Sequence, residues 1–120
     1  MEIHLFDRDQ NAEAFAAGAT VFNEGATGEV MYALLEGQVE IVINGKVVER
    51  IGPGGVFGEM ALVEDRPRVA TARVTSNARL VSVDRKRFMF LVQQNPFFAL
   101  QIMAIMAGRL RHMNEGIQSA

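Results

Sequence analysis

The sequence predicts a mainly β fold followed by C-terminal helices. Nine of the eleven glycines fall between Gly18 and Gly58, where they separate short runs rich in β-branched and aromatic residues. Two of these runs are joined by Asn44-Gly45, a dipeptide typical of a two-residue hairpin turn. After Asp84 the apolar residues recur at helical spacing instead. Strands at this interval favour an antiparallel sandwich or barrel.

The composition is that of one globular domain spanning residues 1–120. With 49% hydrophobic and 22% charged residues, the chain can bury a core. Its formal net charge of −2 offers no basic excess to phosphates, so we expect no direct nucleic-acid binding. Cysteine is absent, which excludes disulfides and thiolate chemistry and fits a reducing compartment. No signal-peptide pattern or membrane-length apolar run occurs, so we expect a cytoplasmic protein without membrane association.

The strand-like runs follow one another along the first half of the chain. They read TVF, VMYALLEG, QVEIVI and KVVERI, and the Asn44-Gly45 turn joins the last two. Strand character returns in VATARV and ARLVSV. There Ala70, Ala72 and Val74 alternate with polar neighbours, which predicts that one face of this segment is buried.

Helices are expected from about residue 85 to residue 115. Asp84 stands where an N-cap belongs, ahead of RKRFMFLVQQ. Asn95 and Pro96 then mark a boundary, because proline suits the first turn of a new helix. In the second helix the apolar residues form a stripe wide enough to bury two sides: Ala99, Leu100, Ile102, Ala104, Ile105, Met106, Leu110, Met113 and Ile117.

The sequence offers no assembled catalytic or metal-binding motif. His4 and His112 lie at opposite ends of the chain, and neither has a companion histidine at metal-ligand spacing. The run GPGGVFG matches neither the phosphate loop of nucleotide hydrolases nor the dinucleotide-binding pattern. We therefore expect a binding module and not an enzyme, with no cofactor or metal.

The stretch GPGGVFGEMALVED followed by RPRVATARV carries charges that its apolar surroundings do not need. It runs from a strand-like segment into a short helix-capable one, so backbone N–H groups near Gly58, Glu59, Met60 and Ala61 are expected to be unpaired and to suit an anion. Arg68 would supply a fixed cation, and Glu59 could accept a hydrogen bond from a sugar hydroxyl. A sugar phosphate satisfies both charges. The alternative is that Arg68 pairs with Glu59 or Asp65 on the surface.

FGEMAL and RPRVATARV resemble the phosphate-binding cassette of the cyclic nucleotide-binding domain family. Upstream, AGATVFNEGATGEVMYALLEGQVEIV resembles the opening strands of that family, with Gly25, Gly28, Tyr32 and Gly37 at turn and core positions. The similarity covers about residues 15–113.

The resemblance implies an eight-stranded antiparallel, jelly-roll-like β-roll at about residues 15–84, with C-terminal helices that move when ligand binds. By analogy, backbone groups of Gly58, Met60 and Ala61 would line the cyclic phosphate, Glu59 would take the ribose 2′-hydroxyl, and Arg68 would pair with the phosphate. The full set of candidate residues that this implies is Phe57, Gly58, Glu59, Met60, Ala61, Arg68, Val69 and Ala70.

Departures from the family pattern shape the expected ligand and partners. Val69 stands where the family often has Ala, Ser or Thr, and its lack of a hydroxyl favours cAMP over cGMP. The chain carries no helix-turn-helix segment after the last helix. Two alternatives stay open: a nucleotide-free module that docks a partner protein, and the sensor fragment of a larger channel, kinase regulator or transcription factor. In either case a homodimer or an effector protein would contact the Met-rich last helix.

Overall fold

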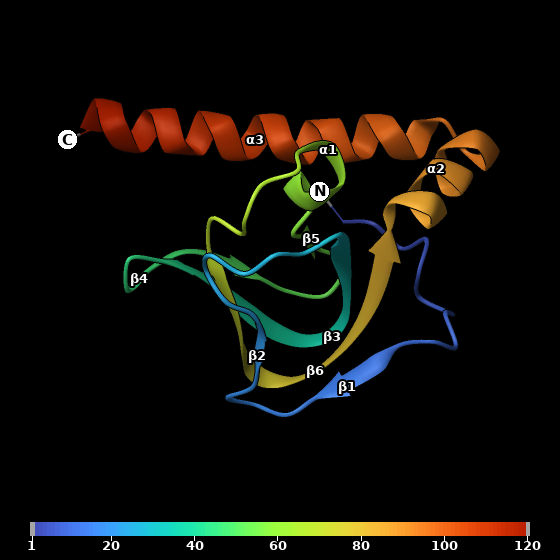
Figure 1. Ribbon diagram of the computed structural model, residues 1–120, viewed down its shortest axis with the longest axis horizontal. Coiled ribbons are helices and arrows are strands. Elements are labelled where there is room, and N and C mark those ends of the chain that lie inside the picture. Colours follow the sequence, from blue (N-terminus) through green and yellow to red (C-terminus); the bar gives the residue numbers. More distant parts are fainter. Residues whose placement is uncertain (1, 120) are drawn as a thin grey trace. The chain divides into compact units, whose positions relative to one another are not determined.

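The computed structural model describes residues 2–119, with side chains described up to Asn114. Two compact units make up the chain: Glu2–Arg85, which holds the strands, and the helical segment from Lys86 onward. The elements, in chain order, are β1 (Glu13–Phe15), β2 (Thr20–Phe22), β3 (Val30–Ile43), β4 (Lys46–Ile51), β5 (Val56–Phe57), α1 (Met60–Val63), β6 (Thr71–Asp84), α2 (Arg85–Gln94) and α3 (Phe97–Ser119) (Figure 1).

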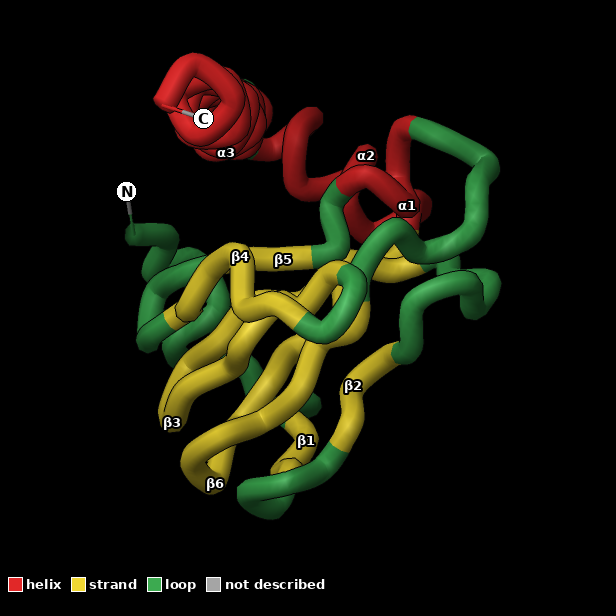
Figure 2. The backbone as a smooth tube through the Cα atoms, turned by 90° about the vertical axis from the view of Figure 1, so that its left-hand side faces the viewer, coloured by secondary structure: helices red, strands yellow, loops and turns green. Residues whose placement is uncertain are grey.

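The strands form one antiparallel sheet built around two long, bent strands. Its order is β1-β6-β3-β4, with β2 added to β6 and β5 added to β3. The tube drawing in Figure 2 shows β3 and β6 running side by side through the sheet, as their register from Val30↔Asp84 to Val42↔Thr71 requires. The hairpin predicted at Asn44-Gly45 is confirmed, because β3 and β4 pair through Ile43↔Lys46 and both turn residues have positive φ, 51° and 78°.

The described residues contain six strands, whereas eight were expected. Two pairs of runs that the sequence separates are each one strand of 14 residues, β3 and β6. In β3 the chain bends at Gly37, where φ is 90° and the register against β6 shifts on both sides, without leaving the sheet. Two short strands, β1 and β5, were not predicted because three and two residues carry no readable alternation.

The core of the β unit lies between the faces of the bent sheet. The alternation predicted for β6 is confirmed, since Ala72 and Val74 are buried while Arg73 is exposed. The buried cluster comprises Leu34, Val39, Ile51, Phe57, Ala72, Val74, Ala78 and Leu80. On the outer face Glu40 of β3 pairs with Arg50 of β4 at 3.5 Å and with Arg73 of β6 at 3.3 Å.

The helical segment begins where the sequence predicts. α2 follows Asp84 directly, and α3 starts one residue after Pro96. The rings of Phe88 and Phe98 lie 5.4 Å apart and join the two helices. Within residues 2–119 no single helix is long and apolar enough to cross a membrane, although α2 and α3 up to Asn114, bent by 120°, reach that length and hydropathy together.

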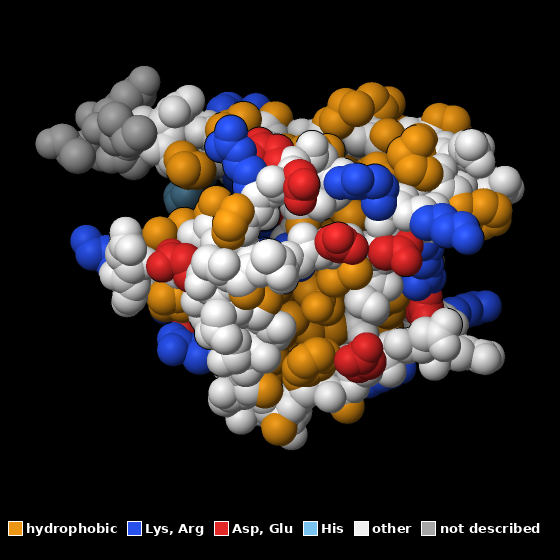
Figure 3. All heavy atoms as spheres, viewed as in Figure 1, with side chains coloured by type: hydrophobic (Ala, Val, Ile, Leu, Met, Phe, Trp, Pro, Cys, Tyr) orange, Lys and Arg blue, Asp and Glu red, His pale blue; other side chains and the backbone are white. Residues whose placement is uncertain are grey.

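α3 buries one side and not two. Phe98 and Ile102 are buried, as expected for its first turns. Five large apolar side chains on the same helix are 59–62% exposed: Phe97, Leu100, Met103, Leu110 and Met113. The space-filling view shows hydrophobic side chains at the surface of this helix (Figure 3). The prediction of two buried sides is therefore wrong for Leu100, Leu110 and Met113, which belong to the predicted stripe. The side chain of Ile117 lies outside the described ones.

Gly37→Ala is expected to lower the free energy of unfolding by about 2–5 kcal/mol. A side chain at φ of 90° is strained, and a Cβ there would meet the carbonyl oxygen of Asn77 and, at 2.7 Å, the Cα of Ala78. Gly45→Ala is the matched control: φ is 78°, but nothing lies within 4 Å of the added Cβ. It should cost only about 1 kcal/mol. Urea denaturation measures both, and equal losses would contradict a steric role for Gly37.

Candidate functional site

Arg68 is held through its main chain by the loop that follows β2. The N–H of Gly25 donates to the Arg68 carbonyl oxygen at 2.7 Å, and the Arg68 N–H donates to the carbonyl oxygen of Ala26 at 2.8 Å. Beside this pair, the Glu24 N–H donates to Oγ1 of Thr71 at 2.9 Å. The segment between α1 and β6 forms no strand or helix of its own. These hydrogen bonds fix its main chain at Arg68, the candidate residue for phosphate binding.

The Arg68 side chain is buried, with 8% of its surface exposed. Nη2 donates to the Val30 carbonyl oxygen at 2.7 Å, and Nη1 donates to the Gly58 carbonyl oxygen at 3.1 Å. The guanidinium carbon lies 4.0 Å from the centre of the Phe22 ring. Nε is the one guanidinium nitrogen that is buried without a hydrogen-bond partner. A buried donor left unsatisfied is costly, so it marks a place where an acceptor would be stabilising.

Phe22, whose ring covers the guanidinium, belongs to a cluster of three aromatic rings. The centres of Phe22 and Tyr32 lie 6.1 Å apart, those of Phe22 and Phe57 6.0 Å, and those of Tyr32 and Phe57 5.5 Å. Burial lowers the pKa of Arg68, while the nearby Tyr32 and Glu59 oppose that shift. Burial also raises the pKa of Tyr32, against the charge of Arg68. Because the ordinary pKa of arginine is so high, the guanidinium stays charged at neutral pH.

Glu59 enters the site at the start of α1. It is 4% exposed, stands at the N-cap of the helix, and makes no side-chain capping bond there. The preceding Gly58 has a φ of 77°, and a Cβ on it would lie 2.8 Å from Nη1 of Arg68. The glycine therefore allows the chain to turn tightly beneath the guanidinium.

One expected feature of this turn is wrong. The N–H of Ala61 is not unpaired, because it donates to the Gly58 carbonyl oxygen at 3.2 Å, and the Leu62 N–H donates to Glu59 at 3.0 Å. A helix of four residues closes its own first turn in this way and leaves fewer free donors than the sequence suggested. Arg68 and Glu59 are therefore the main polar features of the site.

The structure places two of the candidate residues, Gly58 and Glu59, beside Arg68. Buried among the candidates are Phe57, Glu59, Ala61, Arg68 and Ala70, with Gly58 half-buried. Met60 and Val69 are 45% and 69% exposed.

The alternative of a surface ion pair for Arg68 is wrong, because the side chain is buried. A surface pair forms instead between the neighbouring Arg66 and Glu64, at 3.4 Å.

Three contacts of Arg68 escaped the sequence analysis. Phe22 was quoted only as part of a strand, and the carbonyl groups of Val30 and Gly58 leave no trace in the residue type. Gly28 was assigned to a turn, yet a Cβ on it would meet Nε of Arg68 and lie 2.6 Å from Nη2. The need for a glycine next to the Arg68 side chain becomes apparent only once both positions are placed in the fold.

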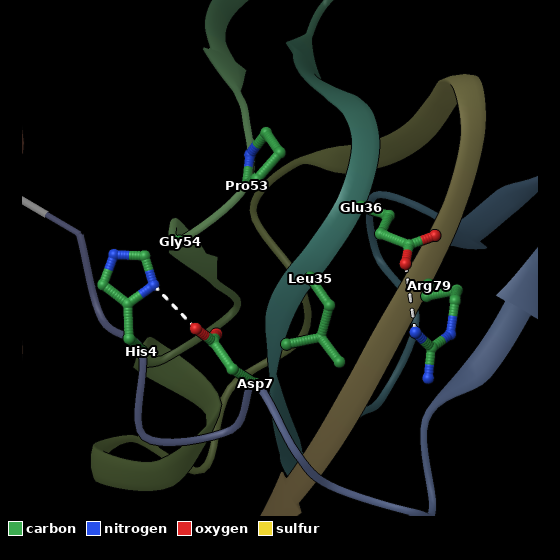
Figure 4. A pocket seen from close by; sticks show the side chains of 7 residues that line it. All are labelled: His4, Asp7, Leu35, Glu36, Pro53, Gly54 and Arg79. Carbon is green, nitrogen blue, oxygen red and sulfur yellow. Dashed lines mark hydrogen bonds and ion pairs between the residues drawn. The ribbon is translucent and has the colours of Figure 1, made fainter.

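A small cavity of about 160 Å³ lies elsewhere in the β unit (Figure 4). Figure 4 shows two pairs facing it, His4 Nδ1 with Asp7 at 3.0 Å and Arg79 with Glu36 at 3.1 Å. Hydrogen bonds to Glu2 and Asp7 raise the pKa of His4, which is exposed. Across residues 2–119, no group of three or more His, Cys, Asp or Glu side chains is placed to hold a metal ion.

Comparison with known proteins identifies a matching family and relatives that align with most of this chain. Residues 12–95 match the family model described as cyclic nucleotide-binding domain. The chain is 31% identical over 108 residues to the CRP-like cAMP-activated global transcriptional regulator of Mycobacterium tuberculosis, in strains CDC 1551 and H37Rv alike. That match covers 86% of this chain and 48% of the regulator, so the chain spans about half the length of these relatives.

Solved structures agree with this relationship. The Thermus thermophilus catabolite activator protein superposes with a TM-score of 0.81 at 26% identity, over 90% of this chain and 53% of that one. The structure described as cAMP bound PfPKA-R (141-441) gives 0.76 at 26% identity, over 88% of this chain and 36% of that one. The N-terminal domain of a transcriptional regulator from Streptomyces coelicolor A3(2) gives 0.64 at 26% identity, over 88% and 77%.

The family match covers most of the chain and includes both the buried Arg68 and Glu59. The chain therefore belongs to the cyclic nucleotide-binding domain family.

Proposed function

We propose that the chain binds a cyclic nucleotide, cAMP in preference to cGMP, in its β unit and signals through its C-terminal helices. The observation that carries this proposal is the buried Nε of Arg68, a charged donor without a partner. A cyclic phosphate would supply the missing acceptor together with the opposite charge. Glu59, buried close by at the start of α1, would then accept a hydrogen bond from the ribose 2′-hydroxyl.

The names of two relatives support cAMP as the ligand. One is called cAMP-activated and the other was solved with cAMP bound. The lack of a hydroxyl on Val69 points the same way, since it removes a hydrogen bond that would favour guanine. The preference for cAMP over cGMP rests on these arguments.

A route for the signal begins at α1. Nε of Arg85, the residue that opens α2, donates to the carbonyl oxygen of Leu62 in α1 at 3.1 Å. A ligand that shifts α1 through Glu59 would therefore act on Arg85, the last residue of the β unit, from which the helical segment continues. This assigns the chain a regulatory role and not a catalytic one.

Calorimetric titration with cAMP and with cGMP tests the binding proposal. We expect heat at a stoichiometry of one nucleotide per chain, with the lower dissociation constant for cAMP. A flat trace with both nucleotides on folded protein would overturn the proposal and favour a nucleotide-free module that docks a partner protein. The chain could also act as the sensor part of a longer channel, kinase regulator or transcription factor, a reading with which binding is compatible.

Arg68→Ala is expected to weaken cAMP binding by about 2–5 kcal/mol, because a desolvated charge pair loses one partner. Arg68→Lys should restore only part of the affinity, since an ammonium cannot hold two carbonyl groups and an anion in the planar geometry of guanidinium. Titration of the three proteins measures this.

Both Arg68 variants should also melt at lower temperature without ligand, because Val30 and Gly58 lose their donors. Lower stability with unchanged affinity would show that Arg68 is only structural.

Glu59→Gln is expected to reduce the preference for a ribose 2′-hydroxyl. A neutral acceptor loses a charge-assisted hydrogen bond of about 1.5–3 kcal/mol. The unaltered protein should bind cAMP more tightly than 2′-deoxy-cAMP, and the variant should bind the two almost equally. If both proteins discriminate to the same extent, Glu59 does not contact the hydroxyl.

We also propose that α3 pairs with α3 of a second copy. Met103, Met106, Leu110 and Met113 follow the alternating spacing of three and four residues that is typical of a two-helix seam. Three of these four are exposed. An effector protein contacting the same residues is the alternative occupant.

Leu110→Glu is expected to shift the chain from dimer to monomer in sedimentation velocity, because a carboxylate in the seam is desolvated without a partner. His112→Glu is the matched control, since His112 is exposed on the same helix but lies outside the seam positions. It should leave the dimer intact. Sedimentation of the unaltered chain as a monomer at every concentration would contradict self-association and favour the effector.

A further inference from the structure

The anion site depends on where the Arg68 guanidinium points. An arginine side chain has about 2 kcal/mol of rotamer entropy, which a ligand must offset if the side chain is mobile before binding. Here the terminal nitrogens already donate to Val30 and Gly58, at 2.7 and 3.1 Å. Both of these acceptors are backbone atoms of the β unit, so the plane of the guanidinium is set before any ligand arrives.

Phe22 supports one face of that plane. The ring centre lies 4.0 Å from the guanidinium carbon, well within the range of a cation–π contact. The ring is itself held in place by Tyr32 and Phe57, with centres 6.1 and 6.0 Å away. A Cβ on Gly58 would lie 3.3 Å from Cε2 of Phe22, so the ring also packs against the turn that opens α1.

Gly28 contributes to the site by having no side chain. A side chain there would meet Nε of Arg68 and lie 2.6 Å from Nη2, so the absence of a side chain at Gly28 makes room for the guanidinium in this position. The other parts of the guanidinium already have partners. Nη2 donates to the Val30 carbonyl, Nη1 donates to the Gly58 carbonyl, and the ring of Phe22 covers one face. Nε remains as the nitrogen without a partner.

We propose that Phe22 is a positioning residue of the anion site, which holds the Arg68 guanidinium so that Nε is presented to a phosphate oxygen. This inference rests on the proposed function and adds to it a residue outside the cassette and the identity of the donating nitrogen. Phe22 contacts Arg68 and acts through it, whether or not it also touches the ligand.

The first test is a double-mutant cycle with cAMP. Phe22→Leu keeps apolar bulk and removes the ring face, so cAMP should bind about tenfold more weakly, which corresponds to about 1.4 kcal/mol. Phe22→Tyr keeps the ring face and should bind like the unaltered protein. In the Arg68→Ala background, Phe22→Leu should cause no further loss. An equal loss in both backgrounds would overturn the proposal, as would unchanged affinity in Phe22→Leu.

Phe15→Leu is the matched control, because Phe15 is another partly buried ring packed on the same core cluster, on β1. It should lower thermal stability to a similar degree and leave cAMP affinity unchanged. A tenfold loss with Phe15→Leu would mean that affinity simply follows core packing and would overturn the role of Phe22.

The second test observes Nε directly. In the ¹H–¹⁵N spectrum of the arginine side chains, the Nε–H signal assigned by its loss in Arg68→Lys should move downfield on addition of cAMP. It should move less in Phe22→Leu at saturating nucleotide. A signal that stays in place while cAMP binds would show that another nitrogen makes the contact.

Failure of the proposed function has a different signature. If neither cAMP nor cGMP binds the unaltered protein, the anion site is rejected together with this use of Phe22. Melting temperatures measured without ligand then decide whether Phe22 and Arg68 interact at all. If they do, Phe22→Leu should lower the melting temperature less in the Arg68→Ala background than in the unaltered protein. Equal decreases would reject the contact itself.

Discussion

Burial of the Arg68 guanidinium is the constraint on which the arrangement of the site depends. Its two terminal nitrogens join the start of β3, at Val30, to the turn before α1, at Gly58. Its main chain joins the same region to the loop after β2 through Gly25 and Ala26. One residue therefore connects the start of β3, the turn before α1 and the loop after β2. Loss of the guanidinium would remove the side-chain bonds to Val30 and Gly58 but leave the main-chain bonds to the loop, so the fold and the site share this residue.

A buried cation is normally a liability, and its surroundings explain why this one is tolerated. Carbonyl oxygens replace water at two nitrogens, and an aromatic ring covers one face. The nearby Glu59 also favours the protonated form of Arg68. What is left uncompensated is a single N–H, at Nε. Most of the guanidinium is therefore used in contacts within the fold, and Nε is the nitrogen that the proposed function assigns to a ligand.

The bent strands give this site its position. Because β3 continues through Gly37, the strand that carries Val30 and Tyr32 at its beginning also pairs with β4 at its end. The short β5 adds Phe57 against Tyr32 and leads straight into Gly58 and Glu59. The Val30 carbonyl oxygen, which accepts from Nη2, therefore lies on β3. The Gly58 carbonyl oxygen, which accepts from Nη1, directly follows β5, the neighbouring strand of the same sheet.

The amino-acid sequence was enough to predict the class of fold, the hairpin at Asn44-Gly45 and the start of the helices after Asp84, and it singled out Glu59 and Arg68 as candidate site residues. These rest on local signals: turn chemistry, apolar period, and charges placed in an apolar run. Only the tertiary structure decided that Arg68 is buried, that Ala61 closes the turn of α1, and that six strands replace eight. It also brought in Phe22 and Val30. Contacts to backbone carbonyls and to a ring 46 positions away (68 − 22) depend on the register of the sheet, which no local pattern of residues encodes.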